Sequence, residues 1–335
     1  MKNQFTTFEA SFLTKLSTID VASISEDKRV TDYLKYLLQH KKYFLKIYSF
    51  VLDEAVKNST KQINELTILD FGTGNGLLAL YAKHCGFKLV YASDIYSNFI
   101  ASAKKLSQSI SIEVEEWMVC NEFDLFNNFS TKQIDIIVGT DVIEHVYDLD
   151  IFFSNINALN KNIISAFTTA SVDDNYFKRK KLEQLMLKDE LEFVEIRKNI
   201  IQQHDSSFDE KQLEILSKAT RGLIKNDIIT YVDDYKKSEL LQPININKYN
   251  TCDPLTGSFT ERILTIEEYK KIYKQHQFKL NIISGFYNDE GNILKAILIK
   301  LINFSINCFN KKYFSRTIAP FILLIGFSRN NQYAD

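Results

Sequence analysis

Residues 66–76 read Leu66-Thr67-Ile68-Leu69-Asp70-Phe71-Gly72-Thr73-Gly74-Asn75-Gly76. The first six are mostly apolar and β-prone, which predicts a buried strand. Three glycines then fall within five residues, in a chain with only 10 glycines where average usage predicts about 23. Glycine permits positive φ and lets backbone N–H groups approach a ligand without a Cβ in the way. The stretch therefore predicts a strand followed by a ligand-binding loop.

The segment after this loop supplies further ligand-binding features. Residues 77–84 have helical spacing, and Gly86 ends the predicted helix. The first turn of a helix presents free N–H groups and the positive end of its dipole, which suits a negatively charged or carboxylate-bearing ligand. Asp94 closes the next predicted strand, residues 88–94, where a carboxylate can accept both hydroxyls of a ribose.

The spacing of the glycines separates two classes of cofactor. The dinucleotide fingerprint is GxGxxG, which surrounds a pyrophosphate. Here the pattern is GxGxG, and Leu77 occupies the position of the third fingerprint glycine. Asp70, two residues before the first glycine, is poorly placed for a pyrophosphate but well placed for a ligand that carries an ammonium group.

Strands and helices alternate over the first half of the chain. This alternation predicts βαβ units and a parallel sheet whose strands are buried on both faces. Helices are expected at 29–57, 77–84, 98–108 and 151–159, and strands at 66–71, 88–94, 112–119, 134–139 and 162–167. Helical patterns then dominate up to residue 277, with strands expected at 278–287 and 318–327 and a helix-period segment at 293–312 between them.

Two motifs resemble a known family, the class I S-adenosylmethionine-dependent methyltransferases. Residues 69–76 resemble motif I of that family, and residues 134–146, which end in Asp141-Val142-Ile143-Glu144-His145-Val146, resemble its fourth motif. The resemblance covers residues 66–167 and the two terminal strands. It implies an α/β fold with a Rossmann-like, seven-stranded, mostly parallel sheet, an antiparallel last strand and a mostly helical insertion between strands five and six.

The resemblance also implies a division of the chain and a set of cofactor-binding residues. The expected parts are a helical segment 1–65, a cofactor-binding core 66–167, a helical insertion or substrate lid 168–277, and terminal strands with an amphipathic helix at 278–330. Asp94 matches the acid that binds the ribose, and Asn121 falls near the acid that contacts adenine, although it is Asn here. The full set expected to bind S-adenosyl-L-methionine is Asp70, Gly72, Thr73, Gly74, Gly76, Asp94, Ile95, Asn121 and Thr140.

His145 is the expected catalytic residue. It follows the fourth strand, and a hydroxyl acceptor gains from a general base with a pKa near neutrality. Asp141 and Glu144 flank His145 and are expected to orient its tautomer or raise its pKa. The alternative is a structural histidine at the start of a helix. Glu144 and Asp141 suit a divalent cation, but nothing else in the sequence supports one, so no metal site is expected.

The insertion, residues 168–277, is expected to determine substrate specificity, because insertions at the carboxyl edge of such a sheet build the acceptor pocket. Arg221 and Arg262 are the predicted substrate-binding residues, through a carboxylate or phosphate of the substrate. The alternative for each arginine is an intrachain ion pair.

Residues 293–312 form a predicted helix with a wide apolar face. The surrounding segment 291–334 carries Lys and Arg but no Asp or Glu. Such a helix suits a peripheral membrane contact with anionic lipid, a homodimer contact, or packing over the sheet. The sequence leaves these three open.

The bulk composition excludes several classes of protein. Because 41 basic and 42 acidic residues leave a net charge of −1, no nucleic-acid partner is expected. The four cysteines form no CxxC pair, which argues against a zinc or disulfide framework. With no apolar run of 18 residues and no signal-peptide pattern, we expect a cytoplasmic protein, or one peripheral to the inner face of a membrane.

These observations favour an S-adenosylmethionine-dependent methyltransferase. The expected acceptor is a small molecule, a sugar or glycan, or a lipid-linked intermediate, methylated at oxygen. The alternatives are a nicotinamide-dependent oxidoreductase on a doubly wound sheet and a non-catalytic binding protein of the same fold.

Overall fold

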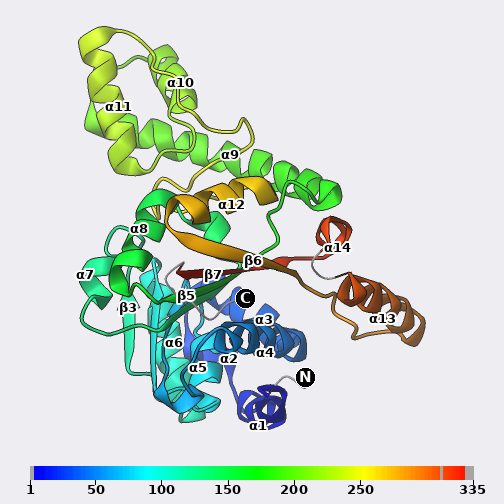
Figure 1. The fold of residues 1–335 in the computed structure, drawn as a ribbon. Helices are drawn as coiled ribbons and strands as arrows, with labels where there is room; N and C mark the ends of the chain where they lie inside the picture. Colours follow the sequence, from blue (N-terminus) through cyan, green and yellow to red (C-terminus); the bar gives the residue numbers. More distant parts are fainter. Residues whose placement is uncertain (1–3, 310–311, 329–335) are drawn as a thin grey trace. The chain divides into compact units, whose positions relative to one another are not determined.

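The structure is a computed structural model that describes residues 4–309 and 312–328. The chain divides into two compact units (Figure 1). The first unit comprises residues 1–143, 148–170 and 267–335, and the second comprises residues 144–147 and 171–266.

The first unit is built on a seven-stranded sheet with the strand order β3-β2-β1-β4-β5-β7-β6. β7 is antiparallel to both of its neighbours, and the other strands run parallel to one another. The strands are β1 (Thr67–Phe71), β2 (Leu89–Asp94), β3 (Glu116–Val119), β4 (Ile136–Thr140), β5 (Ile164–Thr169), β6 (Phe278–Ser284) and β7 (Ile322–Ser328). This arrangement confirms the predicted Rossmann-like fold, including the antiparallel last strand.

The strand order reverses at β1, which pairs with β2 on one side and with β4 on the other. In an open parallel sheet, ligands bind outside the carboxyl ends of the strands where the order reverses. The glycine loop follows β1 and Asp94 ends β2, so the topology brings these two features to one edge.

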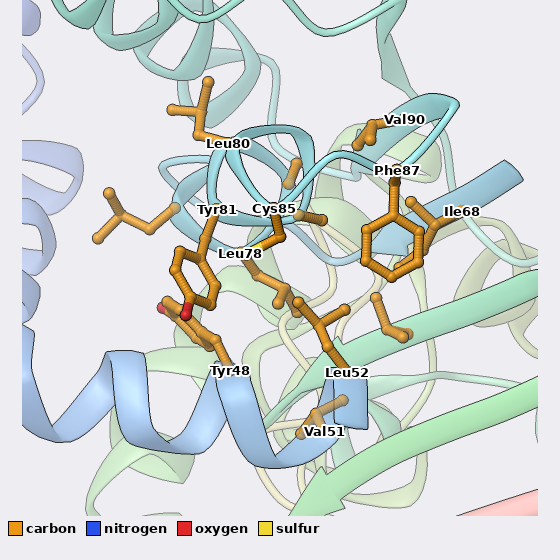
Figure 2. Close-up of a cluster of buried hydrophobic side chains, with 14 of the residues drawn as sticks. Tyr48, Val51, Leu52, Ile68, Leu78, Leu80, Tyr81, Cys85, Phe87 and Val90 are labelled. Carbon is orange, nitrogen blue, oxygen red and sulfur yellow. The ribbon is translucent and has the colours of Figure 1, made fainter. Parts of the chain in front are cut away.

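Six helices pack against one face of the sheet or lie at its edge. They are α1 (Thr6–Leu16), α2 (Val21–Ile24), α3 (Lys28–Gln39), α4 (Lys41–Lys57), α5 (Leu77–His84) and α6 (Ser97–Ile110). Leu52 of α4 and Leu78 of α5 pack with Ile68 and Val90 of the sheet (Figure 2). Burial of these apolar side chains is the main force that holds the N-terminal helices on the sheet.

Aromatic side chains pack on the opposite face. They join α8 (Leu149–Leu159) and α12 (Ile266–Gln275) to the sheet, and α7 (Leu125–Phe129) contacts α8. The ring centroid of Phe152 lies 4.8 Å from that of Phe71 and 5.6 Å from that of Phe167. The sheet is therefore covered on both faces, as the continuous apolar character of its strands requires.

The second unit is mostly helical and holds the insertion between β5 and β6. Its helices are α9 (Tyr176–His204), α10 (Glu210–Ala219) and α11 (Lys225–Ser238). Ile201, Leu216 and Ile228 are fully buried between them. Arg197 is also fully buried, donates to the Ser217 carbonyl at 2.7 Å and pairs with Glu190, so its charge is compensated.

Several predicted boundaries differ from the structure, and the largest shifts among the strand starts are those of β3 and β7. β3 begins at Glu116 rather than at residue 112, because the Glu115 side chain accepts a hydrogen bond from the Val90 N–H at the start of the pairing. β7 begins at Ile322 rather than at residue 318, since a short helix, α14 (Tyr313–Ile318), and Pro320 precede it. Proline has no N–H to offer a strand.

The helix expected at 293–312 is α13 (Ile293–Cys308). Lys311 of that prediction, and Arg329 of the basic segment, lie outside the described residues. Among the helices that the structure describes, none combines the length and the apolar character needed to cross a membrane.

Candidate functional site

The glycine loop is confined so closely that side chains are excluded from it. Gly72, Gly74 and Gly76 all have positive φ, at 71°, 54° and 83°. A Cβ at Gly72 would lie 2.1 Å from a methyl group of Val142, and one at Gly76 would lie 2.7 Å from Trp117. The loop therefore offers bare backbone at the carboxyl edge of the sheet, which is the cradle that a tightly held ligand needs.

Asp94 ties this loop to the end of β2. Its carboxylate accepts the Gly74 N–H at 2.8 Å on one oxygen and the Tyr96 N–H at 2.9 Å on the other. The residue is 8% exposed. Each carboxylate oxygen has two lone pairs, so it can accept more than one hydrogen bond.

Asp70 is held on the other side of the loop. Its Oδ2 accepts the Thr73 hydroxyl at 2.5 Å and the Ala79 N–H of α5 at 3.1 Å. Burial raises the pKa of Asp70 to about 7, although these two hydrogen bonds oppose the shift. Asp70 is therefore close to half ionised at neutral pH, and a cationic partner would favour its charged form.

The remaining residues predicted to bind the cofactor lie at or just after the carboxyl ends of three strands, β2, β3 and β4. Ile95 directly follows β2 and is half-buried, and Thr140 is the last residue of β4. The Asn121 side chain accepts the backbone N–H groups of Phe123 and Asp124 at 3.0 and 3.2 Å, so its carbonyl oxygen shapes the turn after β3. The cofactor roles of these residues stay predictions.

Tyr33 of α3 is a member of this edge that sequence analysis missed. A Cβ at Gly74 would lie 3.1 Å from its ring. The enclosing protein, together with the carboxylates of Asp141 and Asp94, raises the pKa of the Tyr33 hydroxyl. The sequence contains no signal for this placement beyond a tyrosine in a helical pattern, since the contact joins residues 41 positions apart.

A second cluster of functional groups lies in the helical unit. Ligand atoms of Glu144, His145 and Glu261 lie within 4.8 Å of one another. Two backbone hydrogen bonds assemble the cluster, from the Phe259 N–H to the His145 carbonyl at 3.1 Å and from the Arg262 N–H to the Glu144 carbonyl at 2.8 Å. Sequence analysis predicted Glu144 and His145 but missed Glu261, which lies 116 residues from His145.

The protonation of His145 follows from its neighbours. Its Nδ1 lies 2.9 Å from the Phe259 carbonyl oxygen, which can only accept a hydrogen bond. Nδ1 therefore carries the proton, and Nε2 of the neutral ring keeps a lone pair. A backbone carbonyl sets the tautomer, whereas sequence analysis gave that task to Asp141 and Glu144.

This cluster is suited to two kinds of chemistry. The Nε2 lone pair of His145 can take a proton from a substrate hydroxyl, with Glu144 and Glu261 stabilising the resulting imidazolium. The same three side chains are nitrogen and oxygen ligands of the type that binds a divalent cation. Glu261 is itself oriented by the Ser171 hydroxyl, which donates to it.

Asp141, the other predicted catalytic residue, belongs to the first unit. It is exposed, has a φ of 51°, and its N–H bonds to the Thr168 carbonyl at 3.1 Å. This bond continues the pairing of β4 with β5 by one residue. The catalytic role of Asp141 stays a prediction.

Both predicted substrate-binding arginines make contacts within the second unit. Arg221 donates to the Tyr249 carbonyl at 2.9 Å. Arg262 donates to the Val146 carbonyl at 3.1 Å, and its guanidinium lies 4.4 Å from the centre of the Phe259 ring. Each arginine therefore stabilises the second unit through contacts within the protein. Its role in binding the substrate remains a prediction.

The chain matches the family model described as a methyltransferase domain over residues 38–220, which is more than half of its length. A ubiquinone biosynthesis O-methyltransferase of Rickettsia bellii (strain OSU 85-389) is 31% identical over 103 residues, which are 31% of this chain and 41% of that protein. The same protein of strain RML369-C matches equally. The chain thus spans about two fifths of the length of the curated relatives it matches.

Solved structures also resemble the chain at low sequence identity. An S-adenosylmethionine-dependent methyltransferase from Clostridium acetobutylicum ATCC 824 has a TM-score of 0.45 at 12% identity, over 88% of this chain and 98% of that chain. A putative enzyme of this kind from Listeria monocytogenes has a TM-score of 0.43 at 11% identity, over 82% and 97%.

The confinement of Gly72 predicts a large loss of stability in Gly72→Ala. The substitution adds a clash with Val142 to the strain of a positive φ, and we expect it to lower the free energy of unfolding by about 2–5 kcal/mol. Urea denaturation measures this value.

Gly86→Ala is the matched control, because Gly86 also has a positive φ of 95° but no atom within 4 Å of an added Cβ. This substitution adds only the strain of a side chain at positive φ, and it should lower the free energy of unfolding by about 1–2 kcal/mol. Gly72→Ala/Val142→Ala removes the contact at 2.1 Å and keeps the one with the Cβ of residue 142 at 2.9 Å, so stability should return part of the way toward that of the control. Equal losses in the two single variants would show that Val142 does not confine the loop.

Proposed function

The chain belongs to the class I S-adenosylmethionine-dependent methyltransferases, and we propose that it transfers the methyl group to a hydroxyl of a small-molecule acceptor. The family match decides against the nicotinamide-dependent alternative. The single observation that carries the proposal of oxygen as the methylated atom is the clustering of His145, whose Nε2 keeps a lone pair, with the carboxylates of Glu144 and Glu261. The Rickettsia bellii relatives are named O-methyltransferases, which agrees with oxygen as the methylated atom.

The residues at the glycine loop fit the cofactor that the family implies. The Asp94 carboxylate at the end of β2 would accept the ribose hydroxyls, and Gly72 and Gly74 present no side chain to a ligand. Asp70 would hold the ammonium group of the methionine part. When bound, S-adenosylmethionine supplies an electrophilic methyl group and a thioether leaving group.

His145 would act on the acceptor. It follows Thr140, the last residue of β4, by five positions, so the chain links it to the carboxyl edge of the sheet. We propose that Nε2 takes the proton of the acceptor hydroxyl while Nδ1 keeps its bond to the Phe259 carbonyl. Glu144 and Glu261 would hold the resulting imidazolium by their charge.

A screen with labelled S-adenosylmethionine tests the proposed function. Phenolic and other hydroxylated small molecules are offered beside sugars, glycans, lipid-linked alcohols and matched amines. Transfer to a hydroxyl is the expected outcome. Transfer to amines alone would contradict the choice of oxygen, and cofactor binding without transfer to any acceptor would favour a non-catalytic role.

Loss of the Asp94 carboxylate should weaken cofactor binding. We expect Asp94→Ala to reduce the affinity for S-adenosylhomocysteine, measured by titration calorimetry, by about 1–3 kcal/mol, because charged hydrogen bonds to the ribose are lost. Asp32→Ala is the control, since Asp32 is an exposed partner of Lys28 and its loss should leave the affinity unchanged. Equal affinities of Asp94→Ala and the wild type would remove Asp94 from the cofactor site.

The raised pKa of Asp70 predicts a pH dependence of binding. The ligand ammonium requires the ionised carboxylate, so affinity for S-adenosylhomocysteine should rise about tenfold between pH 6 and pH 8, as the pH passes the pKa of about 7. Asp70→Asn should remove this rise. A wild-type affinity that is constant over this range would show that the charge of Asp70 does not contribute to binding.

The same pKa has the opposite effect on the stability of the protein without ligand. Because the folded state holds the Asp70 proton more tightly than the unfolded state, the contribution of this group is largest below its ordinary pKa of 3.8. That contribution is lost as the pH rises toward 7.

Removal of the His145 imidazole should slow the reaction. We expect His145→Ala to lower kcat by about 10²–10⁴ on a hydroxyl acceptor, because the general base is lost. His204→Ala is the control in the same unit, where His204 pairs with Asp233 at 2.7 Å. A full rate in His145→Ala would return His145 to a structural role. Loss of the wild-type rate in a chelator, restored by a divalent cation, would assign the cluster to metal binding instead.

A further inference from the structure

Helix α13 exposes a wide apolar stripe. Its members recur along one side of the helix, and each is more than half exposed. We call these six residues the exposed stripe: Ile293, Leu294, Ile297, Leu298, Leu301 and Phe304. Scattered single apolar residues are normal on a protein surface, but a contiguous group of this kind marks an interaction surface.

The opposite side of the helix already has its partners within the first unit. Ile306 is 2% exposed. The Asn303 side chain accepts the Tyr287 N–H at 2.8 Å and donates to the Tyr287 carbonyl at 2.9 Å. These contacts fix the rotation of α13 about its axis, so the exposed stripe cannot turn inward without breaking them. In Figure 1, α13 stands out from the sheet.

Exposed aromatic side chains also occur on α14, which contacts α13. Tyr313 and Phe314 are both 63% exposed. Their sequence neighbour Lys312 is exposed as well. An aromatic pair beside a lysine is typical of the boundary between lipid headgroups and acyl chains, where the ring enters the apolar layer and the charge stays in water.

The charge of the segment favours an anionic occupant. Residues 291–334 contain no Asp or Glu. On α13, Lys295 and Lys300 are exposed. Asp289 and Glu290 directly precede this segment, and Asp289 interacts with Lys300. On α13 itself the charged residues are cations alone, and an apolar helix face with such cations is complementary to the anionic headgroups of a membrane.

A second copy of the chain fits this surface less well. In a two-fold symmetric contact the same patch meets itself. The cations Lys295 and Lys300 of both copies would then gather at one interface with no acid from this segment to offset them. Like charges brought together in this way oppose the contact.

The geometry of α13 excludes a spanning orientation. Its 16 residues extend about 24 Å, which is less than the roughly 30 Å of a bilayer core. A helix that is apolar on its exposed side and cationic beside it lies in the plane of the interface.

We propose that the exposed stripe of α13, together with Tyr313 and Phe314 of α14, binds the surface of a membrane that contains anionic lipid. This inference is independent of the proposed function, because it rests on no residue of the glycine loop or of the Glu144–His145–Glu261 cluster.

Flotation with lipid vesicles tests the proposal on the full chain. The wild-type protein should float with vesicles of phosphatidylcholine and phosphatidylglycerol, and less with phosphatidylcholine alone. Leu294→Glu/Leu301→Glu places two acids in the exposed stripe and should lower vesicle affinity by more than about tenfold. Both positions are well exposed, so the fold should tolerate the change. Leu185→Glu/Leu191→Glu, at exposed positions of α9, is the matched control and should bind as the wild type does.

A second variant tests the contribution of the two lysines of α13. Lys295→Gln/Lys300→Gln should reduce binding to anionic vesicles by about tenfold or more and reduce its sensitivity to salt, since each lysine near an anionic surface contributes to binding. S-adenosylhomocysteine affinity, which should be the same in all these variants, confirms that the first unit is folded.

Three outcomes would overturn the inference. One is a wild-type protein that binds neither type of vesicle. Another is equal vesicle binding by the wild type and Leu294→Glu/Leu301→Glu. The third is a wild-type dimer in solution that this double variant converts to a monomer without any change in vesicle binding, which would assign the stripe to a second copy of the chain.

Discussion

The hydrogen bond from the Gly74 N–H to the Asp94 carboxylate is the interaction on which the cofactor edge depends. It joins the loop after β1 to the end of β2. On the other side of the loop, Asp70 accepts the Ala79 N–H and so holds the first turn of α5. Two carboxylates from adjacent strands therefore hold the loop, and the side chains of Thr73 and Asn75 add hydrogen bonds of their own. Burying the two carboxylates is costly, and the hydrogen bonds to backbone N–H groups offset that cost.

The clamped loop also explains why the surrounding residues are fixed so closely. Val142 follows the end of β4 and fills the space in which a Cβ of Gly72 would lie, and the Tyr33 ring lies against Gly74. Residues from α3, β2, β3 and the segment after β4 thus meet around the same three glycines. A ligand held there contacts positions that come from well-separated parts of the sequence, so its site exists only after the sheet has formed.

The cluster of Glu144, His145 and Glu261 depends on backbone pairing rather than on a buried carboxylate. Backbone pairing of residues 144–145 with residues 259–262 brings Glu261 to His145 and fixes the histidine tautomer through the Phe259 carbonyl. The general base that we propose, His145, belongs to the second unit. If α13 also binds a membrane, as we propose, the enzyme can take acceptors that are dissolved in or attached to lipid. That consequence rests on both proposals.

The sequence by itself determined the strands of the sheet, the glycine loop and the positions of several helices. Its signals there are local, since apolar runs, helical periodicity and glycine spacing act within a few residues. Only the tertiary structure decided the positions of Tyr33 and Glu261, the structural tasks of Arg221 and Arg262, and the outward orientation of α13. These features arise from contacts between residues far apart in the chain, or from burial of one helix side against a distant partner. No periodicity within a segment encodes such contacts, because they depend on which surfaces the folded sheet leaves open.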